Sequence, residues 1–411
     1  MPDIMTLDVL KQAVAGQAAA FRCVTEYQPA GGPGDKVFPP TYEGGKYAVE
    51  TRMIDGEAVS CVLLDSVPSQ ANRMELALLE AVRAGRINLP LIEARFDDDS
   101  LLKKFTVTSL EAPHRIADAI FRDSMFEENK QKVMFRKSEK GKILDTADLR
   151  NATGLFGLCP TALVFGVWDS TGPRGGLGAK FQRAIVSEII GVHAQPGVKT
   201  SSRIDPLQVQ LNAGPIYERF KKNHQNPNWT ISIESAGATP VKVGKKKDGK
   251  PSEVNHSNIP PQITDGGFTI CNAIQTTVLS LVAIRRLRFP LNGKIDPDAR
   301  VDVSARTVLA ALGLLAAVLA REEGTDLRSR CQLVPTQDFT WELLSDPGRE
   351  PKKTKVDGQT AITLFKQAVT DAINMGLPWE NMIPLSPHPD LIKLVSRSQE
   401  LAAHSAEEEG V

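Results

Sequence analysis

One apolar segment sets the first limit on the fold. Residues 308–320 are all Ala, Val, Leu or Gly. This run is too short to cross a bilayer, which takes about 20 apolar residues, and Gly313 interrupts it. We therefore expect a helix over 303–322 that is buried in the core of a soluble protein. Residues 1–17 have the pattern of a short amphipathic helix and not of a signal peptide, so we expect a cytoplasmic location.

Around this helix the chain alternates between segments typical of strands and of helices. Residues 58–65 form a strand pattern that leads into a helix, with Ser69 placed as its N-cap and Gly85 at its C-terminal end. Further strands are predicted at 161–168, 184–192 and 328–334, the first two paired through a glycine-rich loop. Further helices are predicted at 113–126, 273–287 and 360–375, with a solvated excursion at 127–142. This order predicts an α+β fold with a ferredoxin-like sheet.

The charge of the chain is unevenly distributed. Its 411 residues suit one large domain with insertions or two domains, and its 49 basic and 49 acidic residues give no net charge. Residues 160–290 contain 16 Lys and Arg against 8 Asp and Glu, so this middle part carries +8 and the remainder −8. Such a chain can bind a polyanion on one face and stay soluble, although surface charge also segregates without a functional cause.

The sequence offers no motif of a familiar catalytic or metal centre. The glycine-rich segment 171–180 (TGPRGGLGAK) fits neither the P-loop spacing nor the dinucleotide-binding fingerprint. The six histidines lack a partner at metal-ligand spacing, and the five cysteines are scattered without a CxxC pair. We therefore expect no catalytic residue, no metal and no cofactor, and cysteines that are reduced core thiols.

The glycine-rich segment is nevertheless a candidate phosphate-binding site. Arg174, Gly175 and Gly176 are followed by Lys180 and Arg183. Glycines allow a phosphate to approach backbone amides closely, and the flanking cations supply positive charge. The alternative interpretation is a tight turn between two strands.

The start of the helix after Val67-Pro68 is a second candidate. Ser69, Gln70, Asn72 and Arg73 lie where the amides of the first turn are unpaired and the helix dipole is positive. A cation at this end is unfavourable unless an anion lies beside it, so we expect a phosphate beside Arg73. The alternative is ordinary capping followed by a surface arginine.

Two further groups of cations are candidates for phosphate contacts. Residues 242–261 are predicted to form a projecting loop or hairpin, and its lysines at Lys245, Lys246 and Lys247 would neutralise phosphates without reading sequence. Arg285 and Arg286 end a predicted helix, where cations also complement the helix dipole. Aromatic residues make up only 6% of the chain, so we expect contacts to the nucleic-acid backbone rather than base stacking on a sheet.

Several blocks of the chain resemble the backbone subunit of type I-G (formerly I-U) CRISPR interference complexes, a family of the RAMP superfamily. They lie within residues 15–345 and read VPSQANRMELALLE, HRIADAIFRDS, GLCPTALVFGVWDSTGPRGGLGAKFQRAIVSEIIG, VNHSNIPP, TTVLSLVAIRRLRFP and LRSRCQLVP. The block VNHSNIPP adds His256 to the candidate RNA contacts.

The resemblance implies a modified ferredoxin-like (RRM-like) palm with finger and thumb insertions over 1–345. It places a thumb at about 229–269 and a C-terminal helical extension at 346–411. The implied function is that of a guide-RNA-binding backbone subunit, which oligomerises along CRISPR RNA in a type I, Cascade-like complex for antiviral defence. Base pairing by the guide then reads the target, so the protein holds only the RNA backbone.

The partners that the resemblance implies are all macromolecules of this complex. They are the guide RNA, target DNA through the guide, other copies of this chain, a large subunit, a subunit that processes the RNA handle, and a recruited helicase-nuclease, with no membrane. A competing interpretation is a RAMP-type endoribonuclease that processes precursor or target RNA, for which His114, His256 or Asp205 would act. A generic RNA chaperone is the third alternative.

Overall fold

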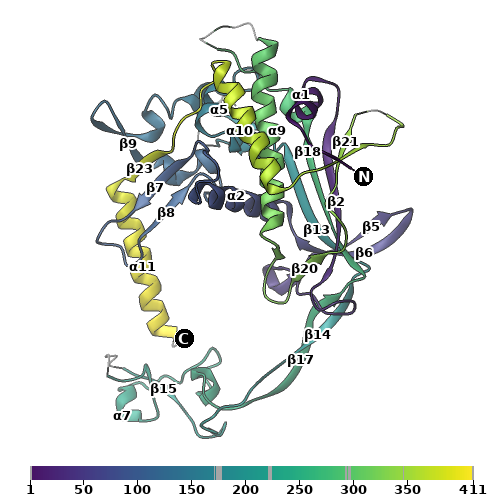
Figure 1. Ribbon diagram of the computed structural model, residues 1–411. Coiled ribbons are helices and arrows are strands. Elements are labelled where there is room, and N and C mark those ends of the chain that lie inside the picture. The colour runs from purple at the N-terminus through teal and green to yellow at the C-terminus, as the bar shows by residue number, and fades with distance from the viewer. Residues whose placement is uncertain are drawn as a thin grey trace. The chain divides into compact units, whose positions relative to one another are not determined.

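The computed structural model describes residues 2–170, 172, 178–220, 225–291, 294, 298–345 and 347–409, with side chains up to residue 403. The chain divides into two compact units (Figure 1). Unit 1 contains Met1–Asp98, Lys104–Gln195 and Phe268–Ile392, and unit 2 contains Asp99–Lys103, Pro196–Gly267 and Lys393–Val411. Helices and strands are mixed, which confirms the prediction of an α+β fold.

Unit 1 is built on a ten-stranded sheet. Eight strands follow one another across it in the order β1 (Asp3–Ile4), β22 (Lys352–Lys355), β21 (Trp341–Leu344), β2 (Ala20–Pro29), β18 (Asn272–Ser280), β13 (Ile185–Val192), β6 (Glu57–Asp65) and β5 (Val49–Ile54). The remaining two are β20 (Gln332–Pro335), which pairs with β2, and β19 (Thr325–Asp326), which pairs with β20. The predicted strands at 58–65 and 184–192 are thus present, and of the predicted strand at 328–334 only 332–334 lie in a strand, but the neighbours of these strands differ from the expectation.

Four of these strands are antiparallel neighbours in the order β20, β2, β18, β13. In the chain they alternate with two helices, α2 (Val67–Arg83) and α9 (Ala299–Glu322), to give β2, α2, β13, β18, α9, β20. Strand β6, which the sequence suggested as the first of the series, instead lies outside β13 and pairs with it. The first strand of the series is β2, because it is the one that β18 and β20 flank.

Helix α9 is the centre of the core. It packs against β18, α2, α1 (Leu7–Ala15), α8 (Leu281–Arg285) and α10 (Gly358–Asn374), and α9 and α10 run side by side (Figure 1). The helix is long and apolar enough to cross a membrane by composition, but 89% of its most apolar window is buried inside the protein. Gly313 permits close contact with the sheet, because a Cβ there would lie 2.8 Å from Leu279 Cδ1. The predicted core helix is confirmed.

A second, five-stranded sheet also belongs to unit 1. Its order is β10 (Gln131–Met134), β9 (Ser124–Glu128), β23 (Ile383–Pro387), β7 (Ile92–Phe96) and β8 (Phe105–Thr108). The prediction of a helix at 113–126 is wrong, since only the turn Arg115–Ala117 and α3 (Ala119–Arg122) are helical before β9 begins. The predicted excursion at 127–142 contains β10, so the hairpin of β9 and β10 completes the sheet edge. Residues after 346, expected as a helical extension, supply β22 and β23 besides α10.

In two regions the sequence predicted the wrong type of element. Residues 161–168 form α6 (Thr161–Phe165) and the two-residue strand β11 (Val167–Trp168), because a short apolar run without periodicity fits a buried helix as well as a strand. Residues 273–287 form β18 and α8 instead of one helix. The β-branched content of β18 favours a strand, and the polar side chains between its apolar ones suit its place between β2 and β13.

The remaining elements of unit 1 are short. They are β3 (Thr41–Tyr42), β4 (Lys46–Tyr47), α4 (Ile143–Thr146), α5 (Thr153–Leu158) and β12 (Lys180–Phe181), which pairs with β11. Four cysteines are buried as expected, whereas Cys271 is exposed.

Unit 2 consists largely of one insertion between β13 and β18. A two-stranded ribbon of β14 (Gln195–Arg203) and β17 (Ile259–Thr269) carries a small fold between its strands. That fold contains β15 (Tyr217–Glu218), β16 (Trp229–Thr230) and α7 (Ile233–Ala236). The expected thumb at about 229–269 covers the second half of this insertion. Helix α11 (Pro389–Glu409) begins in unit 1 and continues into unit 2.

Candidate nucleic-acid interface

The start of α2 is organised differently from the sequence-based expectation. Ser66, not Ser69, is the N-cap, and its hydroxyl accepts a hydrogen bond from the Ser69 amide at 3.4 Å. Val67 and Pro68 form the first turn, which suits proline because the amide it lacks would be unpaired there. Ser69 is therefore inside the helix, with its side chain free to turn toward the preceding strand.

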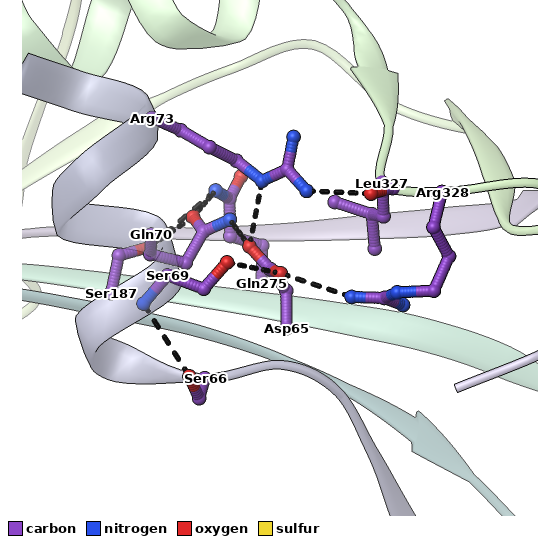
Figure 2. Close-up of polar contacts among 9 residues, drawn as sticks. All are labelled: Asp65, Ser66, Ser69, Gln70, Arg73, Ser187, Gln275, Leu327 and Arg328. Carbon is purple, nitrogen blue, oxygen red and sulfur yellow. Dashed lines mark hydrogen bonds and ion pairs between the residues drawn. The ribbon is translucent and has the colours of Figure 1, made fainter. Parts of the chain in front are cut away.

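Asp65, the last residue of β6, is the anion that lies beside Arg73. Its carboxylate is fully buried and accepts hydrogen bonds from Ser69 Oγ at 2.8 Å, Gln70 Nε2 at 2.6 Å and Arg73 Nε at 3.0 Å. Arg328 Nη2 reaches the same carboxylate at 3.3 Å, and Arg73 Nη2 donates to the Leu327 carbonyl at 2.8 Å (Figure 2). A phosphate is therefore not needed to explain an arginine at this helix start, because the protein itself supplies the anion.

Gln70 extends this network into the sheet. Its Oε1 atom accepts from Ser187 Oγ at 3.0 Å and from Gln275 Nε2 at 2.7 Å, and Tyr27 Oη donates to Gln275 Oε1 at 2.8 Å. Figure 2 shows Gln70 directed toward Ser187 and Gln275, and its side chain is buried. Of the four predicted contacts at this helix start, Asn72 is the exposed one.

A second constellation holds the base of the β11–β12 hairpin. Helix α6 ends before Gly166, whose φ of +84° is rarely adopted by other residues and where an added Cβ would crowd Arg183 N at 3.0 Å and Phe181 O at 3.1 Å. Arg115 Nη1 donates to the Gly166 carbonyl at 2.9 Å, and Arg183 Nε donates to the Phe165 carbonyl at 3.2 Å. Both bonds fix the backbone just before β11, and the Arg183 bond also ties the segment after β12 to it.

The side chains at the base of this hairpin carry more positive than negative charge. Arg115 forms a buried ion pair with Glu75 at 2.6 Å. Burial raises the pKa of Glu75 despite the arginine beside it, and burial together with repulsion by Arg115 lowers the pKa of Arg183. Arginine stays protonated in proteins, so two guanidinium groups here face one carboxylate. Arg183 has no carboxylate partner within ion-pair distance among the residues that the structure describes.

Next to this hairpin lies a groove of about 220 Å³ with cations on its walls. Lys180 of β12 and Arg286, the residue after α8, line it, and both are exposed. The other described lining residues are Leu149, Leu163, Phe181, Gln182, Ala184, Ala283 and Leu287. The fold thus brings together two predicted RNA contacts that are more than a hundred positions apart in sequence.

The other predicted cations of unit 1 differ in their surroundings. Arg285, adjacent to Arg286, donates from Nη2 to the Ala18 carbonyl at 2.7 Å and so ties α8 to the start of β2. Arg174, Gly175 and Gly176 lie outside the described residues. Of the glycine-rich candidate, only Lys180 and Arg183 can be placed.

In unit 2 the lysine stretch is exposed as expected. Lys245, Lys246 and Lys247 are all exposed, and the following turn closes with an ion pair between Lys250 and Asp248 at 2.9 Å. His256 is half-buried, with its ring 5.7 Å from the Trp229 ring in an edge-to-face contact. These lysines can neutralise phosphates, whereas His256 packs inside the unit.

Asp205, a candidate acid or base of the endoribonuclease alternative, has a structural role. Its carboxylate accepts from the backbone amides of Ser257 at 2.5 Å and Leu207 at 3.0 Å, and these bonds lower the pKa of Asp205. In unit 1, Asp118, which the sequence could pair with His114, accepts from the backbone amides of His114 and Ile120. Both carboxylates fix local backbone.

Sequence reasoning missed Asp65 and Trp168. Asp65 ends β6 just before Ser66, the N-cap of α2. From this position its carboxylate can accept hydrogen bonds from the first turn of α2. Trp168 ends β11, three residues before the glycine-rich segment, and is 65% exposed, with Lys180 Nζ 5.3 Å from the centre of its ring. A tryptophan next to a glycine-rich basic segment was a signal that the low aromatic content obscured.

Comparison with known proteins gives one finding. Residues 21–196 match the model of the family described as CRISPR-associated protein GSU0053. The match covers fewer than half of the 411 residues, and over this part the chain is similar to that CRISPR-associated family. The matched residues include β2, α2 and the β11–β12 hairpin. No curated protein matches the chain.

Proposed function

We propose that the protein is a guide-RNA-binding backbone subunit, of the RAMP type, which oligomerises along CRISPR RNA in a type I-G surveillance complex. The observation that carries the proposal is the groove with Lys180 and Arg286 on its walls, beside the hairpin held by Arg115 and Arg183. Cations without an acidic residue among the described lining suit a polyanion whose sequence is not read. The CRISPR-associated family match supports RNA as this polyanion.

The topology supports a palm with insertions. The chain order β2, α2, β13, β18, α9, β20 and the antiparallel sheet order β20, β2, β18, β13 agree with a ferredoxin-like sheet. The insertion between β13 and β18 would be the thumb, and its exposed lysines at 245–247 give it charge for an RNA backbone.

The proposal includes the partners and the location that the sequence predicts. The chain would bind guide RNA and copies of itself, reach target DNA through the guide, and assemble with a large subunit and an RNA-handle-processing subunit in the cytoplasm. A helicase-nuclease recruited to the complex would degrade the target, so this chain requires no catalytic centre.

The test compares two double variants in RNA binding. Lys180→Ala with Arg286→Ala removes the groove cations, and Arg95→Ala with Lys353→Ala removes the same two residue types from exposed positions on β7 and β22. For single-stranded RNAs of unrelated sequence, the slope of log affinity against log salt should fall by about 1.4 in the groove variant, or 0.7 for each phosphate that is no longer neutralised. The matched variant should keep the slope.

Assembly is measured on the same RNAs. The mass of the complex should rise in equal steps as the RNA is lengthened, because each copy covers the same length. Absence of RNA binding by the wild-type protein, or equal slopes in the two double variants, would overturn the assignment of the groove.

A further inference from the structure

We propose that Trp168 is a stacking platform for one unpaired nucleobase of the bound RNA, a contact that rests on the proposed function and adds base stacking to it. The other tryptophans are engaged inside the protein: Trp341 is fully buried, Trp379 packs against Phe156 and Phe365, and Trp229 packs against His256. Trp168 alone among them has most of its surface in solvent.

The ring is held on a rigid support. Trp168 and Lys180 are cross-strand partners in the β11–β12 hairpin. The backbone just before β11 is fixed as well, because Arg115 donates to the Gly166 carbonyl and Arg183 donates to the Phe165 carbonyl. A platform whose backbone is already fixed loses little conformational freedom when a base stacks on it.

Lys180 connects the ring to the groove. Its ammonium lies over the Trp168 ring, at 5.3 Å from the centroid, and the same side chain lines the groove with Arg286. A nucleotide whose base stacks on the indole therefore has a cation within reach of its phosphate, and the next phosphate can follow the groove. Every base has a π-face, so stacking tolerates any sequence, as a guide of variable sequence requires.

The charge of the surroundings favours a nucleic acid over a protein partner. The described residues that line the groove include Lys180 and Arg286 and no Asp or Glu, and Arg183 adds a half-buried guanidinium beside the hairpin. An exposed aromatic ring next to two cations on the walls of a groove matches a stacking platform along an electrostatic track.

The chain offers a closely matched control. Tyr42 is 47% exposed and pairs across the short β3–β4 hairpin with a lysine, Lys46, as Trp168 pairs with Lys180. Trp168→Ala should weaken binding of single-stranded RNA by about 5- to 150-fold. Trp168→Phe should stay close to wild type, because the phenyl ring still stacks, and Tyr42→Ala should bind as the wild type does.

An RNA with abasic sites separates stacking from charge, because it keeps every phosphate and lacks bases. The difference between wild type and Trp168→Ala should vanish on this RNA. Equal weakening on both RNAs would overturn stacking, as would unchanged binding of normal RNA by Trp168→Ala, and the proposed function would survive either result. If Trp168→Ala binds RNA normally but copies no longer assemble on it, the ring belongs to a protein interface instead. Failure of the wild type to bind any RNA would instead refute the proposed function itself.

Discussion

Arg73→Ala tests whether the start of α2 is a structural centre or an RNA contact. The structure predicts a loss of stability, because Arg73 Nε binds the buried Asp65 carboxylate at 3.0 Å and Nη2 binds the Leu327 carbonyl at 2.8 Å. These two bonds connect α2 to the end of β6 and to the segment before β20. We expect RNA affinity of the folded protein to remain at the wild-type level.

The magnitude follows from what remains after the substitution. A hydrogen bond to a charged group contributes about 1.5–3 kcal/mol, and Arg73 makes two such bonds. The Arg73 side chain is 34% exposed, so solvent screens part of its interaction, and Arg328, Ser69 and Gln70 still bind Asp65. We therefore expect the free energy of unfolding to fall by about 2 kcal/mol, well below the roughly 3–5 kcal/mol for a buried charge left without a partner.

Urea denaturation followed by circular dichroism measures this change. Arg83→Ala in the same helix is the control, since Arg83 is exposed and its pairs with Glu80 and, at 3.5 Å, with Glu111 are surface ion pairs that contribute at most about 1 kcal/mol each. Arg73→Lys keeps the charge without the guanidinium fork and should lie between wild type and Arg73→Ala. Unchanged stability of Arg73→Ala together with lost RNA affinity would refute this reasoning and restore Arg73 as a phosphate contact.

Other expected outcomes concern unit 2, the hairpin and catalysis. Alanine at all three lysines of 245–247 should leave the melting temperature unchanged and lower the salt slope of RNA binding by about 0.7 for each phosphate that these lysines neutralise in the wild type; an unchanged slope would place these lysines away from RNA. Gly166→Ala should lower the free energy of unfolding by about 1–3 kcal/mol, because its φ of +84° is strained for alanine and the Cβ would lie 3.0 Å from Arg183 N; calorimetry measures it. In the folded protein the pKa of Asp205 lies below its ordinary value of 3.8. The stability that the ionised carboxylate provides is therefore fully present above pH 3.8 and is lost as the pH falls through the pKa of Asp205 in the folded state. The amide proton of Ser257 should report this titration by NMR, and a midpoint at or above 3.8 would contradict it. RNA incubated with the protein and a divalent cation should stay intact on a denaturing gel, whereas cleavage would favour the endoribonuclease alternative.

Local pattern predicted elements well where one periodicity dominated. The helices at 67–83, 299–322 and 358–374 have helical spacing of apolar residues, although their N-caps are Ser66, Asp298 and Asp357 and the sequence pattern predicts the first cap at Ser69. It failed at 161–168 and 272–280, where the length of the apolar run could not separate a buried helix from a buried strand. Pairing with β2 and β13 decided the second case, and neither partner is near β18 in sequence.

The candidate site shows the same division between local and distant information. The sequence located the cations at Arg73, Lys180, Arg285 and Arg286, but it could not say which were already neutralised or bonded. Arg73 meets an anion that is only eight residues away, yet its second acceptor is Leu327. Arg285 is bound to Ala18, and Lys180 and Arg286 share a groove only because α8 follows a strand that pairs with β13.

The amino-acid sequence by itself determined the mixture of helices and strands, the buried core helix α9 and the basic middle of the chain, because propensity, capping and charge are properties of neighbouring residues. The tertiary structure alone decided the order of strands in the sheet, the burial of Asp65 under its ring of donors, and the exposure of Trp168 beside Lys180 and Arg286. Those features depend on contacts between segments far apart in the chain. Whether a cation binds its own protein or is left for a ligand is settled by such contacts, since a carboxylate or carbonyl within about 3 Å engages the charge that a phosphate would otherwise meet.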